Sequence, residues 1–469
     1  MTTLTSIIAP SNVLTPSSTA TVTNKTISGA NNTISVCLTS DVSGALPVAN
    51  GGFGQSSYTD GQLLIGNTAG CLTKTTLTAG CNIAITNSAG SISIAYCEPI
   101  VYNNSIWMWG RNCFFTTPRG NLGNNSGLNS SSPVSVVGGF TDWSQLSTGS
   151  DHSLGVRTNG TAWGWGAGGT GQLGAGAAGD QSSPVSVVGG FTNWCQVAAG
   201  GGHSAAVRTN GTLWSWGANS SGQLGTDNYT SRSSPVSVVG GFTDWCQVAL
   251  GDSNGAAVRS NGTLWSWGYN TQGQLGDNTI VGKLSPVSVI GGFTDWCSIS
   301  LAGHSIALRQ NGTIWAWGQN GSGQLGDITT VSRSSPVSVI GGFTDWCQVT
   351  AGGQHSLAIR TNSSLYAWGQ NCFGQLGTNN TTSSLSPVSV IGGFTDWCQV
   401  SASYQQSFGL RTNGTLFSWG RNIYGSLGDN TCDHKSSPVS IAGGFTDWSC
   451  LSYPQSGNFS SGAIRSTVV

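Results

Sequence analysis

Four histidines stand at one position of a repeated sequence, and four imidazoles at equivalent positions are a candidate metal site. The same position in three further copies carries amide or hydroxyl side chains, whose affinities for metals differ greatly. All seven side chains can form a hydrogen bond, so a shared structural hydrogen bond explains the set better. We therefore expect no metal and no cofactor. The seven residues are His152, His203, His304, His355, Asn254, Gln406 and Ser460.

Charged residues also recur from copy to copy. An arginine recurs seven times, and an aspartate precedes a tryptophan in six copies, with Asn193 in the remaining copy. Guanidinium and carboxylate groups can pair, or the arginine can pack on an aromatic ring. Either arrangement makes these residues part of a structural scaffold. They are Arg157, Arg208, Arg259, Arg309, Arg360, Arg411 and Arg465, and Asp142, Asp244, Asp295, Asp345, Asp396 and Asp447.

No nucleophile, base and orienting group stand out together as a catalytic set. Serine and threonine are frequent, but the few histidines are tied to the repeat. Pairs of aspartates could hydrolyse glycosides if loops brought them together, yet no pair is singled out. The sequence predicts a protein that is not an enzyme, with a depolymerase as an open alternative.

The elements that position these residues come from a long internal repeat. The segment Ser-Pro-Val recurs seven times, and each copy continues into Gly-Gly-Phe-Thr-Asp-Trp or its Asn variant. A period in this range indicates a solenoid, a propeller or an array. The prolines are 50 or 51 residues apart, at Pro133, Pro184, Pro235, Pro286, Pro336, Pro387 and Pro438.

One copy predicts four short strands. In residues 195–245 these are 195–199, 203–208, 212–216 and 235–239, and Asn210-Gly211 between the second and third predicts a type I′ hairpin turn. Four antiparallel strands per unit, repeated seven times, predict a seven-bladed β-propeller. Half copies remain at the two ends, so pairing of residues 463–469 with 106–109 would complete the seventh blade. The closure blade would then contain residues 101–143 and 449–469.

These units resemble the regulator of chromosome condensation repeat family. The resemblance covers about residues 101–469 and rests on Gly-x-x-His-Ser segments and on Trp-Gly followed by Gly-Gln-Leu-Gly, as in residues 171–174 and 222–225. Members are seven-bladed propellers, and some are guanine-nucleotide exchange factors or chromatin binders. The resemblance implies the fold, whereas function depends on the site.

Recognition is expected where the copies differ. The connection from Gly-Gln-Leu-Gly to Ser-Pro changes its content and carries Arg232, Lys283, Arg333 and Lys435. Loops that vary on a rigid scaffold commonly bind ligands. The first copy is five residues longer between Trp-Gly and Leu-Gly. This insertion contains Cys113, Phe114, Phe115 and Arg119, which would either bind a sugar or protein or fold over the closure blade.

Composition excludes several functions. The net charge is −1, only 7% of residues are charged, and four are lysines, so no basic surface for nucleic acid is expected. No segment is apolar enough to cross a membrane, and the N-terminus does not resemble a signal peptide.

Five of the 13 cysteines follow the repeat tryptophan where other copies have serine, which predicts a small core residue. They are Cys195, Cys246, Cys297, Cys347 and Cys398.

Residues 1–100 contain none of the repeat. They are rich in Thr, Ser, Asn and Gly, with β-like runs at 19–23 and 92–95. They resemble phage tail-fibre and virion appendage proteins in the stretches LPVANGGFG (46–54) and YTDGQLLIGN (58–67), although Phe53 stands where Thr is common. The resemblance implies a β-rich attachment region that forms a homotrimer, and small β segments commonly gain stability by oligomerising.

The leading hypothesis is a viral tail fibre or spike, located on the virion or outside the cell. Residues 1–100 would contact other virion subunits, and the propeller would bind a host surface glycan or protein, without contacts to nucleic acid or membrane. One alternative is a subunit of an extracellular or cell-surface filament. A second alternative is an intracellular propeller that acts as a regulator or interaction protein.

Overall fold

The computed structural model describes residues 102–114, 117–454 and 459–468, together with the backbone of four short strands nearer the N-terminus. Contacts divide the chain into two units, Met1–Val101 and Tyr102–Val469. The first unit contains two hairpins, β1 (Gln62–Gly66) with β2 (Leu72–Thr76) and β3 (Ile83–Ser88) with β4 (Ser91–Tyr96). The expected strand 92–95 lies in β4, and the expected strand 19–23 lies outside the described residues.

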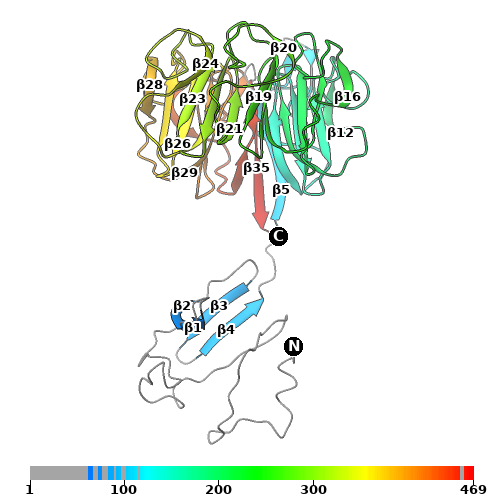
Figure 1. The fold of residues 1–469 in the computed structure, drawn as a ribbon. Coiled ribbons are helices and arrows are strands. Elements are labelled where there is room, and N and C mark those ends of the chain that lie inside the picture. Colours follow the sequence, from blue (N-terminus) through cyan, green and yellow to red (C-terminus); the bar gives the residue numbers. More distant parts are fainter. Residues whose placement is uncertain are drawn as a thin grey trace, which may run out of the picture. The chain divides into compact units, whose positions relative to one another are not determined.

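The second unit is an all-β propeller of seven four-stranded blades, as the repeat predicts (Figure 1). Blade one consists of β9 (Trp143–Thr148), β10 (His152–Arg157), β11 (Ala162–Gly166) and β12 (Gln181–Ser186). Blade two consists of β13 (Trp194–Ala199), β14 (His203–Arg208), β15 (Leu213–Gly217) and β16 (Arg232–Ser237). Blade three consists of β17 (Trp245–Leu250), β18 (Asn254–Arg259), β19 (Leu264–Gly268) and β20 (Lys283–Ser288).

The remaining blades follow the same order. Blade four consists of β21 (Trp296–Leu301), β22 (His304–Arg309), β23 (Ile314–Gly318) and β24 (Arg333–Ser338). Blade five consists of β25 (Trp346–Ala351), β26 (His355–Arg360), β27 (Leu365–Gly369) and β28 (Ser384–Ser389). Blade six consists of β29 (Trp397–Ala402), β30 (Gln406–Arg411), β31 (Leu416–Gly420) and β32 (Lys435–Ser440), with the short helix η3 (Ile423–Gly425) in its connecting loop.

Blade seven is the closure blade, and it is built from both ends of the propeller. Its strand order is β33 (Trp448–Leu451), β35 (Ser460–Val468), β5 (Tyr102–Gly110) and β8 (Ser130–Ser135). β35 and β5 run antiparallel from the pair Ser460–Gly110 to the pair Val468–Tyr102. Both strands project from one end of the propeller (Figure 1). The two half copies are thus joined by strand pairing, which leaves neither strand as a free edge.

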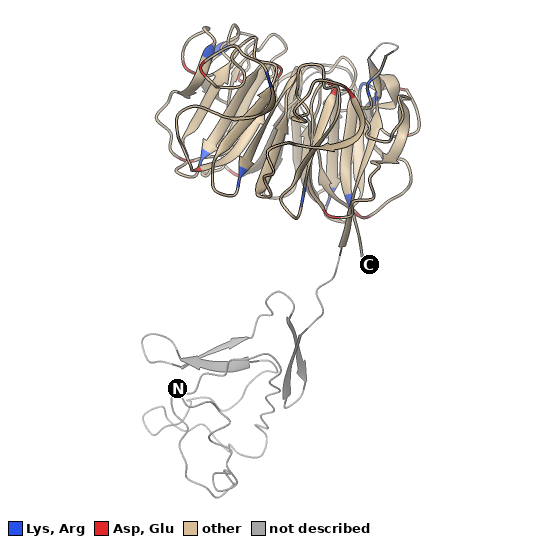
Figure 2. Ribbon diagram, turned by 90° about the vertical axis from the view of Figure 1, so that its right-hand side faces the viewer, with Lys and Arg blue, Asp and Glu red and all other residues tan. Residues whose placement is uncertain are grey.

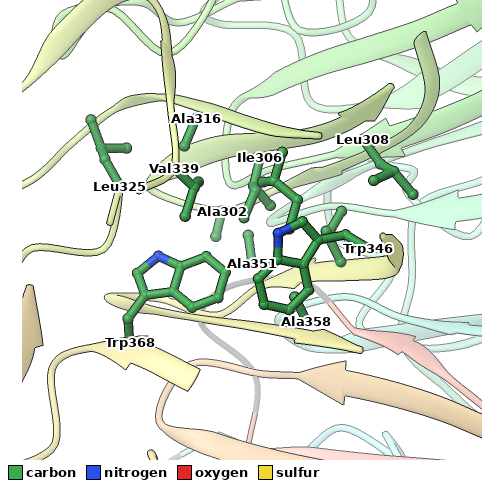
Figure 3. Packing of buried hydrophobic residues seen from close by; sticks show 12 residues of the cluster. Ala302, Ile306, Leu308, Ala316, Leu325, Val339, Trp346, Ala351, Ala358 and Trp368 are labelled. Atoms are coloured by element: carbon green, nitrogen blue, oxygen red, sulfur yellow. The ribbon is translucent and has the colours of Figure 1, made fainter. Parts of the chain in front are cut away.

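The hydrophobic core lies between neighbouring blades. Each cluster combines two large tryptophans of one blade with aliphatic residues of the blade before it, as Figure 3 shows for Trp346 and Trp368 against Ile306 and Leu325. The buried indoles keep their polar atom satisfied, because Trp368 Nε1 donates to the Gln324 carbonyl of the preceding blade at 2.9 Å. All seven blades have an equivalent bond, including Trp109 of blade seven to Ser426 at 3.2 Å.

The turn between the second and third strands differs from the expected type I′ turn. Gly211 has a φ of 73°, but Asn210 is not among the residues with positive φ. Gly211 N donates to Arg208 O and Arg208 N to Thr212 O, the pattern of a type I turn followed by a left-handed residue. The type I′ prediction was wrong because Asn-Gly suits both turns. In blade five the left-handed position is Ser363, with a φ of 62°.

Glutamines of the innermost strands connect five of the seven blades to the next one. The Oε1 atom of Gln196, for example, accepts a hydrogen bond from Val248 N of the following blade at 2.8 Å. Ser298 in blade four and Cys450 in blade seven replace this glutamine. After Cys450 the chain forms β34 (Tyr453–Pro454), which pairs in parallel with β9 of blade one. The equivalent bonds come from Gln145, Gln247, Gln348 and Gln399.

Charged residues lie mainly towards the two ends of the blades, and few occur in the strands between them (Figure 2). No helix in the described part of the chain is long and apolar enough to span a membrane.

Candidate functional site

The recurring histidines form hydrogen bonds between blades. His152 Nε2 lies 2.9 Å from Ser204 Oγ of the next blade, and Ser204 Oγ donates to Gln172 O at 2.7 Å. The histidine and serine are both buried. His304 with Ser356 and His355 with Ser407 repeat this arrangement. The expected shared hydrogen bond is present in these three blades, and its partner is a serine of the neighbouring blade.

This geometry fixes the tautomer of each imidazole. Because the serine proton goes to a carbonyl oxygen, Nε2 of the histidine carries a proton and donates it to the serine oxygen. The other nitrogen, Nδ1, is buried without a partner in His152, His304 and His355. Burial therefore lowers the pKa of these three histidines to about 3. The Nε2 atom that faces the serine already carries a proton, and the serine proton is held by a carbonyl oxygen, so the two are not arranged as a base and the nucleophile that it activates.

His203 lacks this serine because its neighbouring blade has Gly255. A Cβ at Gly255 would approach Trp267 Cε2 to 2.7 Å, so the tryptophan ring occupies the space of a serine side chain. Burial lowers the pKa of His203 to about 4. Among the described residues, no three His, Cys, Asp or Glu side chains come together as a metal site requires.

The recurring arginines make both of the expected kinds of contact. Arg157 Nε donates to Asp142 Oδ1 at 2.7 Å, and its guanidinium lies 4.2 Å from the ring centre of Phe140. Arg208 donates instead to Asn193 Oδ1 at 2.8 Å. The aromatic partner closest to the guanidinium is the phenylalanine of the Gly-Gly-Phe segment in every blade. Each cation is held inside its own repeat unit.

The cysteines after the repeat tryptophan are not core residues. Cys195, like its four equivalents, is exposed, and its Sγ lies 3.3 Å from Val207 O at a β-bulge. Ser144 Oγ in blade one donates to the corresponding carbonyl, Val156 O, at 3.0 Å. Cysteine and serine therefore alternate because both can donate to the same carbonyl oxygen. Partial burial raises the pKa of Cys195, which leaves it a weak nucleophile.

A buried asparagine orders the connecting loops, and the sequence predictions missed it. Asn219 Oδ1 accepts from Leu224 N at 3.0 Å, while its Nδ2 donates to Asn228 O at 2.8 Å. The signal was available, because Trp-Gly-x-Asn recurs in six copies. The equivalents are Asn112, Asn270, Asn320, Asn371 and Asn422.

Three of the candidate loop cations pair within their own loops. Lys283 lies 3.4 Å from Asp277, Arg333 lies 3.2 Å from Asp327, and Lys435 lies 3.6 Å from Asp429. In blade two a threonine, Thr226, stands where these blades have aspartate. Arg232 is exposed and takes part in none of the ion pairs of the described residues.

The insertion of the closure blade forms a small hairpin, β6 (Cys113–Phe114) with β7 (Thr117–Pro118). Phe115 and the side chain of Phe114 lie outside what the structure describes, so the predicted contact role of these two aromatics stays a prediction. Cys113 Sγ lies 3.4 Å from Asn129 Oδ1.

Arg119 follows the hairpin and is partly buried near Asp151 of blade one. Asp151 forms an ion pair with Arg111, and burial raises its pKa against the opposing effects of Arg111 and Arg119. Arg119 therefore lies beside a carboxylate of the neighbouring blade. The structure does not bring the four cationic loop residues and the insertion into one site.

Exposed apolar side chains are concentrated on three consecutive blades. We call Tyr229, Ile280, Val281, Ile328 and Val331 the loop patch, and their exposed fractions are 58–64%. Adjacent loops are tied together, since Asp227 N donates to Leu284 O and Asn278 N to Ser334 O of the following blades. The corresponding loops of blades one and five have no exposed large apolar residue, whereas blade six has Tyr424 and blade seven has Leu128, which is 77% exposed. A polar pocket between blades three and four, lined by Tyr269, Asn254 and Gln319 among others, has a volume of about 370 Å³.

Comparisons with known proteins were made with this geometry in hand. Residues 184–464 match the family model described as the RCC1-like domain. Residues 159–207 and 143–172 match two models of the regulator of chromosome condensation (RCC1) repeat. The matched ranges begin and end inside the seven-bladed propeller.

Curated relatives include proteins of different kinds. The ultraviolet-B receptor UVR8 of Arabidopsis thaliana is 28% identical over 417 residues, which cover 87% of this chain and 81% of the receptor. The human E3 ubiquitin-protein ligase HERC2 is 27% identical over 349 residues, 73% of this chain but 6% of the ligase. The chain thus spans only a small part of that ligase.

Solved structures share the fold. Human WBSCR16 has a TM-score of 0.68 at 19% identity, covering 77% of this chain and 98% of that one. Prp20p of Saccharomyces cerevisiae, whose binding to Gsp1p and histones has been described, has a TM-score of 0.69 at 20% identity, covering 79% and 92%. At such identities the likeness establishes the propeller fold alone.

These matches correct the leading functional hypothesis. None of them is a viral or phage appendage protein, so the interpretation as a tail fibre or spike was wrong. Three further predictions depended on the same interpretation and are withdrawn with it. They are the homotrimer, the virion subunits and host glycan as partners, and the virion or extracellular location. The matches agree better with a propeller that regulates or interacts with other proteins.

Proposed function

The chain belongs to the RCC1-like domain family, and from this premise we propose that its propeller is a protein-interaction module without catalytic activity of its own. The partner would bind at the connecting loops of blades two, three and four. The observation that carries this proposal is the loop patch, because exposed aliphatic and aromatic side chains on a monomer commonly mark interaction surfaces. Fold membership alone would not specify a binding surface.

Rigidity of the loops supports a binding role. The asparagines Asn219, Asn270 and Asn320 hold the three loops that carry the patch, each through bonds at both ends of its amide. A preordered loop loses little conformational entropy when a partner binds. Binding of a partner to the apolar side chains at the tip of such a loop therefore carries a small entropic penalty.

Polar groups surround the patch as they do at protein interfaces. Lys283 and Arg333 are paired with aspartates of their own loops, whereas Arg232 has no ion pair among the described residues. We propose that Arg232 contributes to partner specificity at the edge of the patch, because an unpaired rim cation chiefly affects association rate and salt dependence.

Peptide selection on the full-length protein tests this proposal. Peptides enriched from a displayed random library would be measured against the wild type and against a Tyr229→Ser, Ile280→Ser, Ile328→Ser variant. We expect binding to the variant to weaken by about tenfold or more, since truncating buried interface anchors costs about 1–3 kcal/mol each. All three side chains are exposed, so the substitutions should leave the fold intact.

A matched control uses isoleucines outside the patch. Ile290 and Ile391, each 38% exposed, precede the Gly-Gly-Phe segments that follow the fourth strands. An Ile290→Ser, Ile391→Ser variant should bind the selected peptides like the wild type. The proposal is wrong if no peptide is enriched, or if the control variant loses binding while the patch variant retains it.

A further inference from the structure

The residue that follows Trp-Gly differs among the blades, and it is arginine in two adjacent ones. It is Arg421 in blade six and Arg111 in blade seven, and in the other blades it is Ala167, Ala218, Tyr269, Gln319 or Gln370. The backbone position is the same, because this residue donates its N–H to the residue that precedes the recurring histidine position in its own blade. Two equivalent guanidinium groups are therefore placed side by side around the ring.

Both arginines reach forward to the same position of the next blade, the residue before the recurring histidine or its replacement. For Arg111 the residue at this position is Asp151 of blade one, and the two side chains form an ion pair. Arg421 finds Phe459 of blade seven, with its guanidinium 5.3 Å from the ring centre. Both guanidinium groups lie over the Phe459 ring, since that of Arg111 is 5.2 Å from its centre, but only Arg111 also has a carboxylate partner among the ion pairs of the described residues.

Arg421 keeps its positive charge without a carboxylate partner. Its Nη1 donates to Gln405 Oε1 at 2.7 Å, and its buried Nε has no acceptor. None of the ten ion pairs of the described residues includes it. Its charge also opposes protonation of His434, whose pKa is lowered first by burial and then by Arg421.

Aromatic rings surround this charge. The Arg421 guanidinium lies between Phe459 and Phe373, 4.9 Å from the centre of the latter. Tyr404 and Tyr424 pack edge-on against Phe459 at 5.9 and 5.8 Å. Rings that stack on a guanidinium hold its plane in place and exclude water from one side, which strengthens its interaction with an anion.

We propose that Arg421 and the rings around it form a binding site for a carboxylate of an acidic protein segment. The incoming carboxylate would pair with the Arg421 guanidinium as the Asp151 carboxylate pairs with Arg111, while Phe459 keeps its place beside the guanidinium. Planar carboxylates match the guanidinium fork, and the charge-assisted bonds are stronger than the bond to Gln405. The site lies on blades six and seven, separated from the loop patch by blade five on one side and blade one on the other. It is therefore independent of the proposed function.

Fluorescence anisotropy with a labelled glutamate-rich peptide and the full-length protein tests the site. We expect Arg421→Gln to weaken binding by about ten- to a hundredfold, the effect of losing a hydrogen bond to a charged group. Glutamine is the natural residue of this position in blades four and five, so the variant should fold. Lys74→Gln removes one positive charge from the other unit, Met1–Val101, and should leave binding unchanged.

A second variant tests the geometry rather than the charge. Phe459→Asp would place a carboxylate of the protein itself beside Arg421, as Asp151 lies beside Arg111, and should block the peptide as completely as Arg421→Gln. The assignment is wrong if Lys74→Gln weakens binding as much as Arg421→Gln, if a lysine-rich peptide binds equally well, or if Phe459→Asp binds the peptide normally. Displacement of the peptide by millimolar inorganic phosphate would overturn the choice of a carboxylate.

Discussion

The closure blade and the six continuous blades reach the same four-stranded sheet by different means. In blade two a tight turn joins the second and third strands, which pair from His203–Gly217 to Val207–Leu213. In blade seven no turn joins the corresponding strands, and β35 and β5 pair along their full length, from Ser460–Gly110 to Val468–Tyr102. Longer pairing thus replaces a covalent connection.

The innermost strands of the blades also differ between the closure blade and the continuous blades. Five blades use a glutamine to reach the next blade, whereas blade seven has Cys450 at that position and adds the strand pairing of β34 with β9. In the continuous blades a glutamine side chain provides the contact to the next blade. In the closure blade, extra backbone hydrogen bonds between strands provide that contact instead. The closure is then the place where stability depends most on the chain ends.

Removing the closure strand should have the largest effect. Deletion of residues 460–469 removes β35, including the buried Ala463 and Ile464, and leaves β33 and β5 with unpaired edges. We expect a protein that aggregates and lacks a cooperative thermal transition, measured by size-exclusion chromatography and near-ultraviolet circular dichroism.

A shorter deletion is the control. Removing residues 466–469 takes away the three pairs from Ser466–Asn104 to Val468–Tyr102 and keeps the rest of β35. This variant should fold and melt at a lower temperature than the wild type. If the longer deletion melted like the wild type, pairing of the two ends would not be what closes the ring.

Acid should weaken the four continuous blades that contain the recurring histidine more than the closure blade. Blades one, two, four and five contain neutral buried histidines with a pKa lowered to about 3 or 4, whereas blade seven has Ser460 at this position. Below about pH 6.5 the unfolded chain binds protons that the folded chain does not, so stability is full above that pH and falls as the pH decreases. The expected loss is about 1.4 kcal/mol per histidine and pH unit.

Urea unfolding at about pH 7 and about pH 5 measures this loss. A His152→Gln, His304→Gln, His355→Gln variant is the comparison, because blade six naturally has Gln406 at the position. The variant should lose markedly less stability on acidification than the wild type. An equal loss in both proteins would assign the acid sensitivity to other groups.

The smallest expected effect concerns one turn of a continuous blade. Ser363 adopts a φ of 62°, which costs a residue with a Cβ about 1 kcal/mol. Its carbonyl also lacks the bond from the next tryptophan that Gly312 O receives from Trp346 N at 3.1 Å. Ser363→Gly should therefore stabilise the protein by about 1 kcal/mol, measured as a shift in the urea midpoint.

The reciprocal change is Gly312→Ser in blade four. There a Cβ would approach Thr344 O to 2.2 Å, so this variant should be destabilised. Together the two variants measure what a turn contributes to a continuous blade. If Ser363→Gly were neutral or destabilising, the backbone at Ser363 would not be strained.

Much of the fold could be predicted because the period of the repeat determines the number of blades and the order of their strands. The spacing of the prolines gave seven units, and β14 has the bounds expected from alternation at residues 203–208. Pro235 shifted the expected fourth strand, since it lies inside β16 at a break in the pairing register rather than at the strand entry.

Contacts between units could not be predicted in the same way. The bond of Gln196 joins residues 52 positions apart, and the exchange of Cys195 for serine depends on a β-bulge. The sequence did not single out Arg421, because its position in the repeat is mostly occupied by uncharged residues. Its contact with Phe459 of the next blade is seen only in the structure. Function was wrongly inferred because the low-complexity residues 1–100 were given more weight than the repeats.

The pairing of Val468 with Tyr102 has a consequence for the order of the blades. Each continuous blade contains a turn at the place where the closure blade has the two ends of the propeller, and those ends lie side by side. In residues 102–468 alone, joining these ends with a short linker and opening the chain at another such turn, for example at Asn261 and Gly262, would preserve every blade and every contact between blades except those of the opened turn. The propeller is therefore a natural candidate for circular permutation, and no blade is structurally the first.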